Sequence, residues 1–200
     1  MGAVTIEARE FWDAQAATFD EEADHGLRDA VVRDAWARLL VPLLPATPAC
    51  VPDLGCGTGT LSVLLAQANH TVTGLDLAPL MVETARVKAR EAGQEVTFVV
   101  GDASRPPLPQ GAFDVVLARH VLWALPDPSE ALTNWLSLLR PGGLLLLIEG
   151  RWGSGVGLSA AQAGQLVRAH RQQVTVQMLD DPQLWGRTID DERFLIVSPS

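Results

Sequence analysis

Apolar side chains recur along the chain in patterns that distinguish helices from strands. In residues 6–19 and 27–41 they fall three and four positions apart, so each segment has one apolar face and is predicted to be an amphipathic helix. Short, continuous apolar runs follow, most of them ended by glycine, aspartate or proline. Such runs are typical of strands covered on both faces. The chain is therefore predicted to begin with helices and to continue with a buried sheet.

Strands and helices alternate through the middle of the chain. The predicted strands cover residues 49–54, 71–75, 96–100, 113–118 and 144–148, and the predicted helices cover residues 60–68, 79–92 and 128–139. Pro141, Gly142 and Gly143 predict a turn before the fifth strand. Since this alternation builds βαβ units, we expect an α/β fold with a parallel, doubly wound sheet.

The last fifty residues indicate a different arrangement. Residues 159–171 return to helical spacing, and residues 174–179 and 194–197 are predicted to be two more strands. Only a loop through Pro182 and Trp185 separates these strands, so we expect them to pair antiparallel at the edge of the sheet.

Pro52 lies inside the first predicted strand, which the topology places at the centre of the sheet. Proline has no N–H group to donate to a neighbouring strand, so we expect a local irregularity there.

Composition and charge exclude several classes of protein. Two hundred residues, 48% of them apolar, suffice for one domain with a substantial core. A formal charge of −9 with scattered basic residues disfavours nucleic acid as a partner. No run of about eighteen apolar residues and no basic-then-apolar N-terminus occurs. We therefore expect a cytoplasmic, soluble protein that does not bind membranes and is a monomer or homodimer.

The residues available for chemistry are few in kind. Cys50 and Cys56 lie on one predicted strand and its turn, where buried free thiols are expected rather than a disulfide or metal pair. Tyrosine is absent and Lys88 is the only lysine, so histidines and carboxylates remain for proton transfer. The acidic residues 20–25 are predicted to be a solvated linker. No metal site is expected.

The first predicted strand ends in three alternate glycines, Gly55, Gly57 and Gly59, just before a helix. Glycine permits positive φ and close approach of a ligand, and the helix start offers N–H donors, so an anionic or carboxylate-bearing ligand is expected. The dinucleotide fingerprint G-x-G-x-x-G is not matched, because Thr60 occupies its sixth position. A sharp turn without a ligand is the alternative interpretation.

Polar residues follow the next three strands. Ligands of doubly wound sheets lie beyond the carboxyl ends of the strands, so Asp76, Asp102 and His120 are predicted to lie near the glycine loop. Asp76 has the spacing from Gly59 at which a carboxylate accepts from ribose hydroxyls, and Asp102 can accept from a purine amine. Each aspartate alone could instead cap the following helix or turn. Together with the loop they predict an adenosine ligand.

The sequence resembles the class I S-adenosylmethionine-dependent methyltransferases of the small, UbiE-like branch. The resemblance covers Phe11 to about Ile148 and rests on five motifs in order and at family spacing: VPDLGCGTG (51–59), GLDLAPLM (74–81), GDA (101–103), FDVVLA (113–118) and LRPGG (139–143). It implies a Rossmann-like, seven-stranded sheet with an antiparallel last strand. It also implies S-adenosylmethionine as methyl donor.

The resemblance further implies roles for individual residues. Gly55 and Gly57 are expected to hold the methionine part of the cofactor, Asp76 its ribose, Asp102 and Ala103 its adenine, and the Arg119 carbonyl its amino group. The other predicted cofactor-binding residues are Asp53, Cys56, Gly59, Leu77, Met81 and Gly101.

The acceptor side of the site is predicted from the residues after the fourth and fifth strands. Trp12, Trp123, Arg151 and Trp152 are the expected pocket residues, because aromatic faces suit an apolar or cationic acceptor. His120 is the candidate general base, and packing against the adenine is its alternative role. The N-terminal helix with Phe11, Trp12 and Phe19 is predicted to be a lid. Trp36, Trp135 and Trp185 are predicted packing residues.

The predicted function is S-adenosylmethionine-dependent methyl transfer to a small-molecule acceptor by in-line displacement. The Asn/Asp-Pro-Pro-aromatic signature is missing at residues 119–122 and no Pro-Cys dipeptide occurs, which disfavours nucleobases. A non-catalytic S-adenosylmethionine-binding module is the first alternative. A nicotinamide-dependent oxidoreductase is less favoured because of Thr60 and because it has no use for Asp102. One domain is expected, with N-terminal helices or lid in 1–45, a cofactor-binding core in 49–150, and a helix and strand pair in 151–200.

Overall fold

The alternating apolar strands form one sheet, as the hydrophobic pattern predicts. The computed structural model describes residues 3–46 and 48–200, so the first two residues of the predicted N-terminal region lie outside it. The strands are β1 (Cys50–Leu54), β2 (Thr71–Asp76), β3 (Thr97–Val100), β4 (Phe113–Arg119), β5 (Leu139–Arg151), β6 (Thr175–Met178) and β7 (Glu192–Ser198). Their order is β3-β2-β1-β4-β5-β7-β6. β7 runs antiparallel to both neighbours and the other pairs are parallel, which confirms the predicted reversed last strand.

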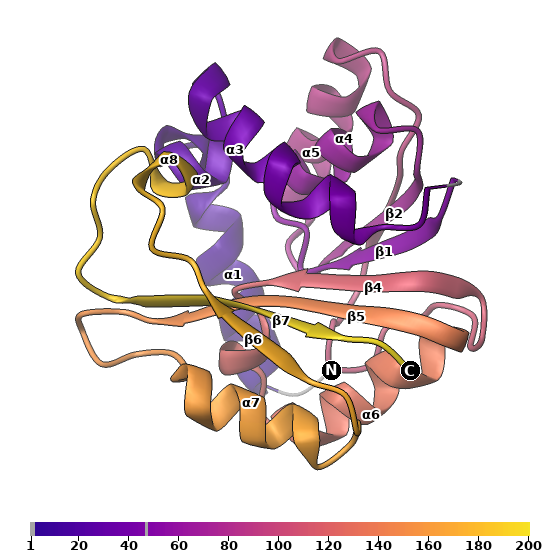
Figure 1. The fold of residues 1–200 in the computed structure, drawn as a ribbon. Helices are drawn as coiled ribbons and strands as arrows, with labels where there is room; N and C mark the ends of the chain where they lie inside the picture. Colours follow the sequence, from indigo (N-terminus) through magenta and orange to yellow (C-terminus); the bar gives the residue numbers. More distant parts are fainter. Residues whose placement is uncertain (1–2, 47) are drawn as a thin grey trace.

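Helices cover both faces of the sheet (Figure 1). They are α1 (Ala3–Gln15), α2 (Ala23–Gly26), α3 (Ala30–Leu40), α4 (Thr60–Gln67), α5 (Pro79–Glu91), α6 (Pro128–Leu138), α7 (Ala160–Arg168) and α8 (Pro182–Trp185). α3, α4, α5 and α8 lie on one face, and α6 and α7 lie on the other. None of the described helices is long and apolar enough to cross a membrane.

Successive side chains of a strand point to opposite faces of the sheet, so each strand contributes to a core on both faces. In β4, Val115 and Leu117 pack with the α3 and α4 side, whereas Val116 and Ala118 pack with α6 and α7. Both sets are buried, which explains why residues 115–118 of β4 and 144–148 of β5 are apolar without interruption. Trp36, Trp135 and Trp185 are buried packing residues as predicted; each indole N–H donates to a backbone carbonyl.

Pro52 coincides with an irregularity, as expected. β1 pairs with β2 at all five positions, including Pro52 with Thr73, but its ladder to β4 contains only Asp53 and Leu54. The N–H of Cys50 donates instead to the Asp114 carboxylate at 2.8 Å. A side chain thus replaces a strand partner beside the proline.

Two local predictions near β5 and β7 were wrong. Pro141, Gly142 and Gly143 do not form a separate turn but belong to β5, where the pairing register with β4 shifts between Phe113 and Val115. α6 ends at Leu138 and β5 begins at the next residue, Leu139. The predicted loop before β7 contains the short helix α8, capped by Asp181.

The acidic residues 20–25 are not a solvated linker. They form a 3₁₀ turn (Phe19–Glu21) and α2, and α3 begins only at Ala30 because the Asp29 carboxylate caps the N–H of Val31 at 2.7 Å. Sequence alone did not indicate this order, since the contacts that hold the acidic residues come from distant parts of the chain.

Candidate functional site

A cavity of about 370 Å³ lies at the carboxyl ends of β1 to β5, where a doubly wound sheet binds its ligand. Its walls follow the strand order. Asp102 comes after β3, Asp76 ends β2, and Asp53 lies in β1. His120 follows β4 and Trp152 follows β5. The cavity therefore extends from three carboxylates at the ends of β1, β2 and β3 to aromatic side chains that follow β4 and β5. Its volume suits a small molecule.

The loop between β1 and α4 needs its glycines. Gly55, Gly57 and Gly59 have φ of 69°, 54° and 74°, a region that other residues rarely adopt. A Cβ on Gly55 would lie 2.3 Å from Val121, and one on Gly57 would lie 3.2 Å from the Phe19 ring. Gly55 and Gly57 both line the cavity, so a ligand there can approach their backbone closely.

Carboxylates hold this loop in place and face the cavity. Asp76 accepts from the N–H of Gly57 at 2.8 Å and of Ala78 at 2.9 Å, and burial raises its pKa. Asp102 accepts from the N–H of Ser104 at 2.8 Å. Because each carboxylate oxygen has two lone pairs, both groups keep acceptor capacity for ligand hydroxyls or amines. Burial also raises the pKa of Asp53 to about 6, although Ser62 donates to it at 2.6 Å.

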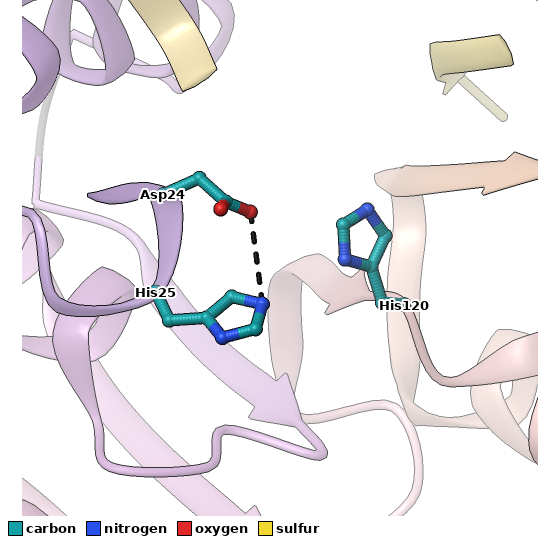
Figure 2. A group of neighbouring side chains, drawn as sticks. All are labelled: Asp24, His25 and His120. Carbon is teal, nitrogen blue, oxygen red and sulfur yellow. Dashed lines mark ion pairs between the residues drawn. The ribbon is translucent and has the colours of Figure 1, made fainter. Parts of the chain in front are cut away.

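Two histidines from separate parts of the chain meet at the cavity (Figure 2). His120 follows β4 with a φ of 59°, and its N–H donates to the Ile148 carbonyl at 2.8 Å. Burial, together with Arg119 and Arg193, holds the pKa of His120 well below 6.5. His25, on α2, also has a lowered pKa, chiefly because of burial. Both imidazoles are therefore neutral at pH 7.

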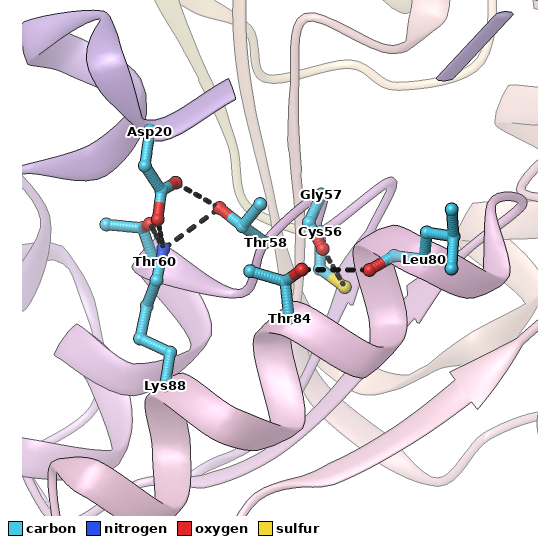
Figure 3. A network of polar contacts seen from close by, with 8 residues as sticks. All are labelled: Asp20, Cys56, Gly57, Thr58, Thr60, Leu80, Thr84 and Lys88. Atoms are coloured by element: carbon cyan, nitrogen blue, oxygen red, sulfur yellow. Dashed lines mark hydrogen bonds and ion pairs between the residues drawn. The ribbon is translucent and has the colours of Figure 1, made fainter. Parts of the chain in front are cut away.

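The N-terminal segment is fastened to the glycine loop by a polar network that sequence analysis missed (Figure 3). Asp20 forms an ion pair with Lys88 at 2.8 Å and accepts from Thr58 Oγ1. Lys88 also donates to the hydroxyls of Thr58, at 2.9 Å, and Thr60. A single lysine in an acidic chain was the signal that could have pointed to this contact.

The structure brings most predicted site residues together. Those that line the cavity are Asp53, Gly55, Cys56, Gly57, Asp76, Leu77, Met81, Asp102, Ala103, Arg119, His120, Trp12, Trp123 and Trp152. Gly59, Gly101 and Arg151 are not among its lining residues: Gly59 faces Ala85 and Phe98, Gly101 faces Leu75 and Pro107, and Arg151 is exposed. Lining residues that sequence analysis did not predict include Leu61, Val121 and Leu125.

Removal of residues 1–19 should weaken ligand binding more than it lowers the melting temperature of the sheet core. The deletion takes away Trp12 and Phe19, which line the cavity, but leaves the strands intact. Calorimetry and thermal unfolding of the truncated protein measure the two effects. Unchanged ligand affinity would mean that α1 is only a packing helix.

Known proteins are similar to this chain in sequence and in fold. The methyltransferase-domain family matches residues 52–147. Over 141 residues the chain is 35% identical to the ubiquinone biosynthesis O-methyltransferase of Xanthomonas axonopodis pv. citri, covering 70% of this chain and 56% of the relative. Over 117 residues it is 38% identical to the demethylmenaquinone methyltransferase of Thermus thermophilus, covering 57% and 53%. The chain thus spans little more than half the length of either relative.

The matched residues contain the glycine loop and the three carboxylates described above. The chain belongs to the class I S-adenosylmethionine-dependent methyltransferases. A solved structure of this methyltransferase fold, the [4+2]-cyclase SpnF, superposes with a TM-score of 0.71 and 22% identity, over 84% of this chain and 80% of that one.

The cofactor of these methyltransferases, S-adenosylmethionine, fits the cavity chemically. Gly55 and Gly57 present backbone where a side chain would collide with Val121 or Phe19. Asp76 and Asp102 supply acceptors for a ribose and an exocyclic amine. These acceptors fit the adenosine part of S-adenosylmethionine, and the loop spacing disfavours a dinucleotide.

Proposed function

We propose that this methyltransferase moves the methyl group of S-adenosylmethionine to an oxygen or carbon of a flat, conjugated small molecule of the phenol or quinol type. The observation that carries the proposal is the single cavity that joins the carboxylates of β1 to β3 to the aromatic cluster after β4 and β5. Within that cluster, Trp152 lies edge-on to both Trp123 and His120, with ring centroids 5.3 and 5.1 Å apart. Flat acceptors can stack on such faces.

The names of the relatives support the same acceptor class. One acts in ubiquinone biosynthesis as an O-methyltransferase and the other is a demethylmenaquinone methyltransferase. Both names describe quinone chemistry, and a quinol ring is flat and conjugated.

The chain's own residues would act by binding, orientation and exclusion of water. The bound cofactor supplies an electrophilic methyl group on a sulfonium. Asp76 and Asp102 would fix its nucleoside, while Trp12, Trp123 and Trp152 would hold the acceptor in line and keep water out. Positioning two reactants in a closed, dry site supplies much of the acceleration of such a displacement. His120 is neutral at pH 7, so it would pack against the acceptor without adding charge.

A non-catalytic S-adenosylmethionine-binding module is the second candidate. The observation in its favour is that the same fold occurs in a [4+2]-cyclase, so the fold alone does not decide methyl transfer.

A metabolite screen tests the proposed function. The protein is incubated with S-adenosylmethionine and a library of phenols, quinols, amines, thiols and carboxylic acids, and release of S-adenosylhomocysteine is measured. Turnover with phenols or quinols is the expected result. Turnover confined to amines or thiols would contradict the acceptor class, and binding of S-adenosylmethionine without turnover of any compound would favour the binding module.

The pH dependence of turnover should show no histidine inflection near 6.5. Burial and two arginines lower the pKa of His120, so its imidazole becomes protonated only at more acidic pH. For a non-ionising acceptor, the pH profile of kcat/KM should therefore be the same in the wild type and in His120→Ala from about pH 6.5 to 8. Steady-state kinetics of the wild type and of His120→Ala across this range measure it. An inflection near 6.5 that His120→Ala abolishes would contradict the packing role.

A further inference from the structure

Asp24, His25 and His120 form a cluster of metal-ligand type beside the cavity. One ligand atom from each residue lies within 4.8 Å of the other two (Figure 2). The ring nitrogen of His25 that faces Asp24 is Nε2, which lies 3.7 Å from a carboxylate oxygen. We propose that these three residues bind one divalent transition-metal ion, with Zn²⁺ as the reference ion.

One carboxylate and two arginines surround the imidazoles: Asp24 favours a bound cation, whereas the positive charges of Arg119 and Arg193 oppose it. Imidazole binds metals through a ring nitrogen that carries no proton. Within the described part of the chain, the basic group that lies within 4 Å of the Asp24 carboxylate is the His25 imidazole, whose Nε2 is 3.7 Å away. Arg119 donates to the backbone carbonyl of Asp24, not to its carboxylate, and Arg193 is paired with Asp191 at 2.8 Å. The negative charge of Asp24 is thus not cancelled by a direct arginine contact.

The ligand set indicates which ions fit. Two imidazole nitrogens and one carboxylate oxygen are typical of Zn²⁺ and other first-row transition metals, whereas Mg²⁺ prefers oxygen ligands. Three protein ligands leave at least one coordination position open. His25 and His120 both line the cavity, so an open position can face it.

The cluster also joins two parts of the chain that are far apart in sequence. Asp24 and His25 lie on α2, in the N-terminal segment, whereas His120 lies at the end of β4. A bound ion would therefore hold the N-terminal segment against the sheet, in addition to the Asp20–Lys88 ion pair. Metal binding should raise the melting temperature, because an ion that binds only the folded chain stabilises it.

Calorimetry with chelator-treated protein and Zn²⁺ alone tests the site. One equivalent of Zn²⁺ should bind, and Mg²⁺ should not. Zn²⁺ binding should weaken by at least about tenfold in each of Asp24→Asn, His25→Ala and His120→Ala. Replacing a residue that only hydrogen-bonds to a metal ligand already weakens metal binding by about that factor. His170→Ala is the matched control, because His170 contacts Ser129 on α6, away from the cluster, and it should leave binding unchanged.

A second measurement uses the wild-type protein, so it does not depend on whether a variant folds. Diethylpyrocarbonate labels accessible histidines, and mass spectrometry reports the rate at each one. Zn²⁺ should slow labelling of His25 and His120 several-fold and leave His170 unaffected. No binding of Zn²⁺, or equal labelling of His25 and His120 with and without it, would overturn the proposal. Neither measurement involves methyl donor or acceptor, so the metal site and the proposed function can fail independently.

Discussion

Asp76→Asn should weaken binding of S-adenosylmethionine by at least about 100-fold. Two hydrogen bonds from ribose hydroxyls to a carboxylate contribute about 1.5–3 kcal/mol each, and about 1.4 kcal/mol corresponds to tenfold in affinity. The asparagine amide would also place a donor against the N–H of Gly57 or Ala78, which now donate to the two carboxylate oxygens. The glycine loop would therefore shift as well. Isothermal calorimetry with S-adenosylmethionine measures the loss.

Asp114→Asn is the control for this experiment. Asp114 also accepts from a backbone N–H, that of Cys50 at 2.8 Å, but it lies at the start of β4, at the opposite end of the strand from the cavity. Its replacement should leave cofactor affinity unchanged. Full affinity in Asp76→Asn would show that Asp76 does not hold the ribose, and binding of NAD in preference to S-adenosylmethionine would contradict the assigned cofactor.

Glu149→Ala should lower the free energy of unfolding by about 2–5 kcal/mol, because it leaves two inward-facing N–H groups without an acceptor. Glu149 is fully buried in β5, and its Oε1 accepts from the N–H of Val121 at 3.0 Å and of Leu122 at 2.7 Å. These bonds fix the segment that places His120 and Trp123 at the cavity, so kcat/KM should fall too. Urea unfolding measures the stability change.

Glu149→Gln separates the contribution of the hydrogen bonds to stability from the contribution of Glu149 ionisation. Burial raises the pKa of Glu149 from 4.5 to about 8, so between these values the folded protein binds more protons than the unfolded chain. The free energy of unfolding therefore falls as pH rises through this window, by up to about 1.4 kcal/mol per pH unit from this one group, and levels off above it. Glutamine keeps an acceptor but does not titrate, so its unfolding free energy should depend less on pH.

Glu130→Gln is the matched control, because the Glu130 side chain is half exposed and its ion pair with Arg105 lies at the surface. Exposed pairs of this kind contribute little to stability. This variant should therefore keep the pH dependence of the wild type. An equal pH slope in Glu149→Gln and the wild type would show that Glu149 is ionised at neutral pH.

The sequence by itself determined the sheet and the polar side of the site. Apolar runs predicted the five parallel strands. Two of the three alternate glycines, Gly55 and Gly57, and the aspartates at the ends of β2 and β3 line the cavity as predicted. These predictions succeed because they depend on local signals. Hydrophobic period, turn glycines and the position just past a strand are each set by a few neighbouring residues, and the topology rule then gathers the strand ends at one edge.

Only the tertiary structure decided the features that depend on contacts between distant residues. Asp20 belongs to a network because Lys88 lies beside it, and His25 reaches the cavity because α2 folds against the end of β4. Burial and charge from other elements set the pKa values of His120 and Glu149, and the packing of Ala85 and Phe98 takes Gly59 away from the cavity. Desolvation and packing are properties of the assembled core, so no stretch of sequence contains them.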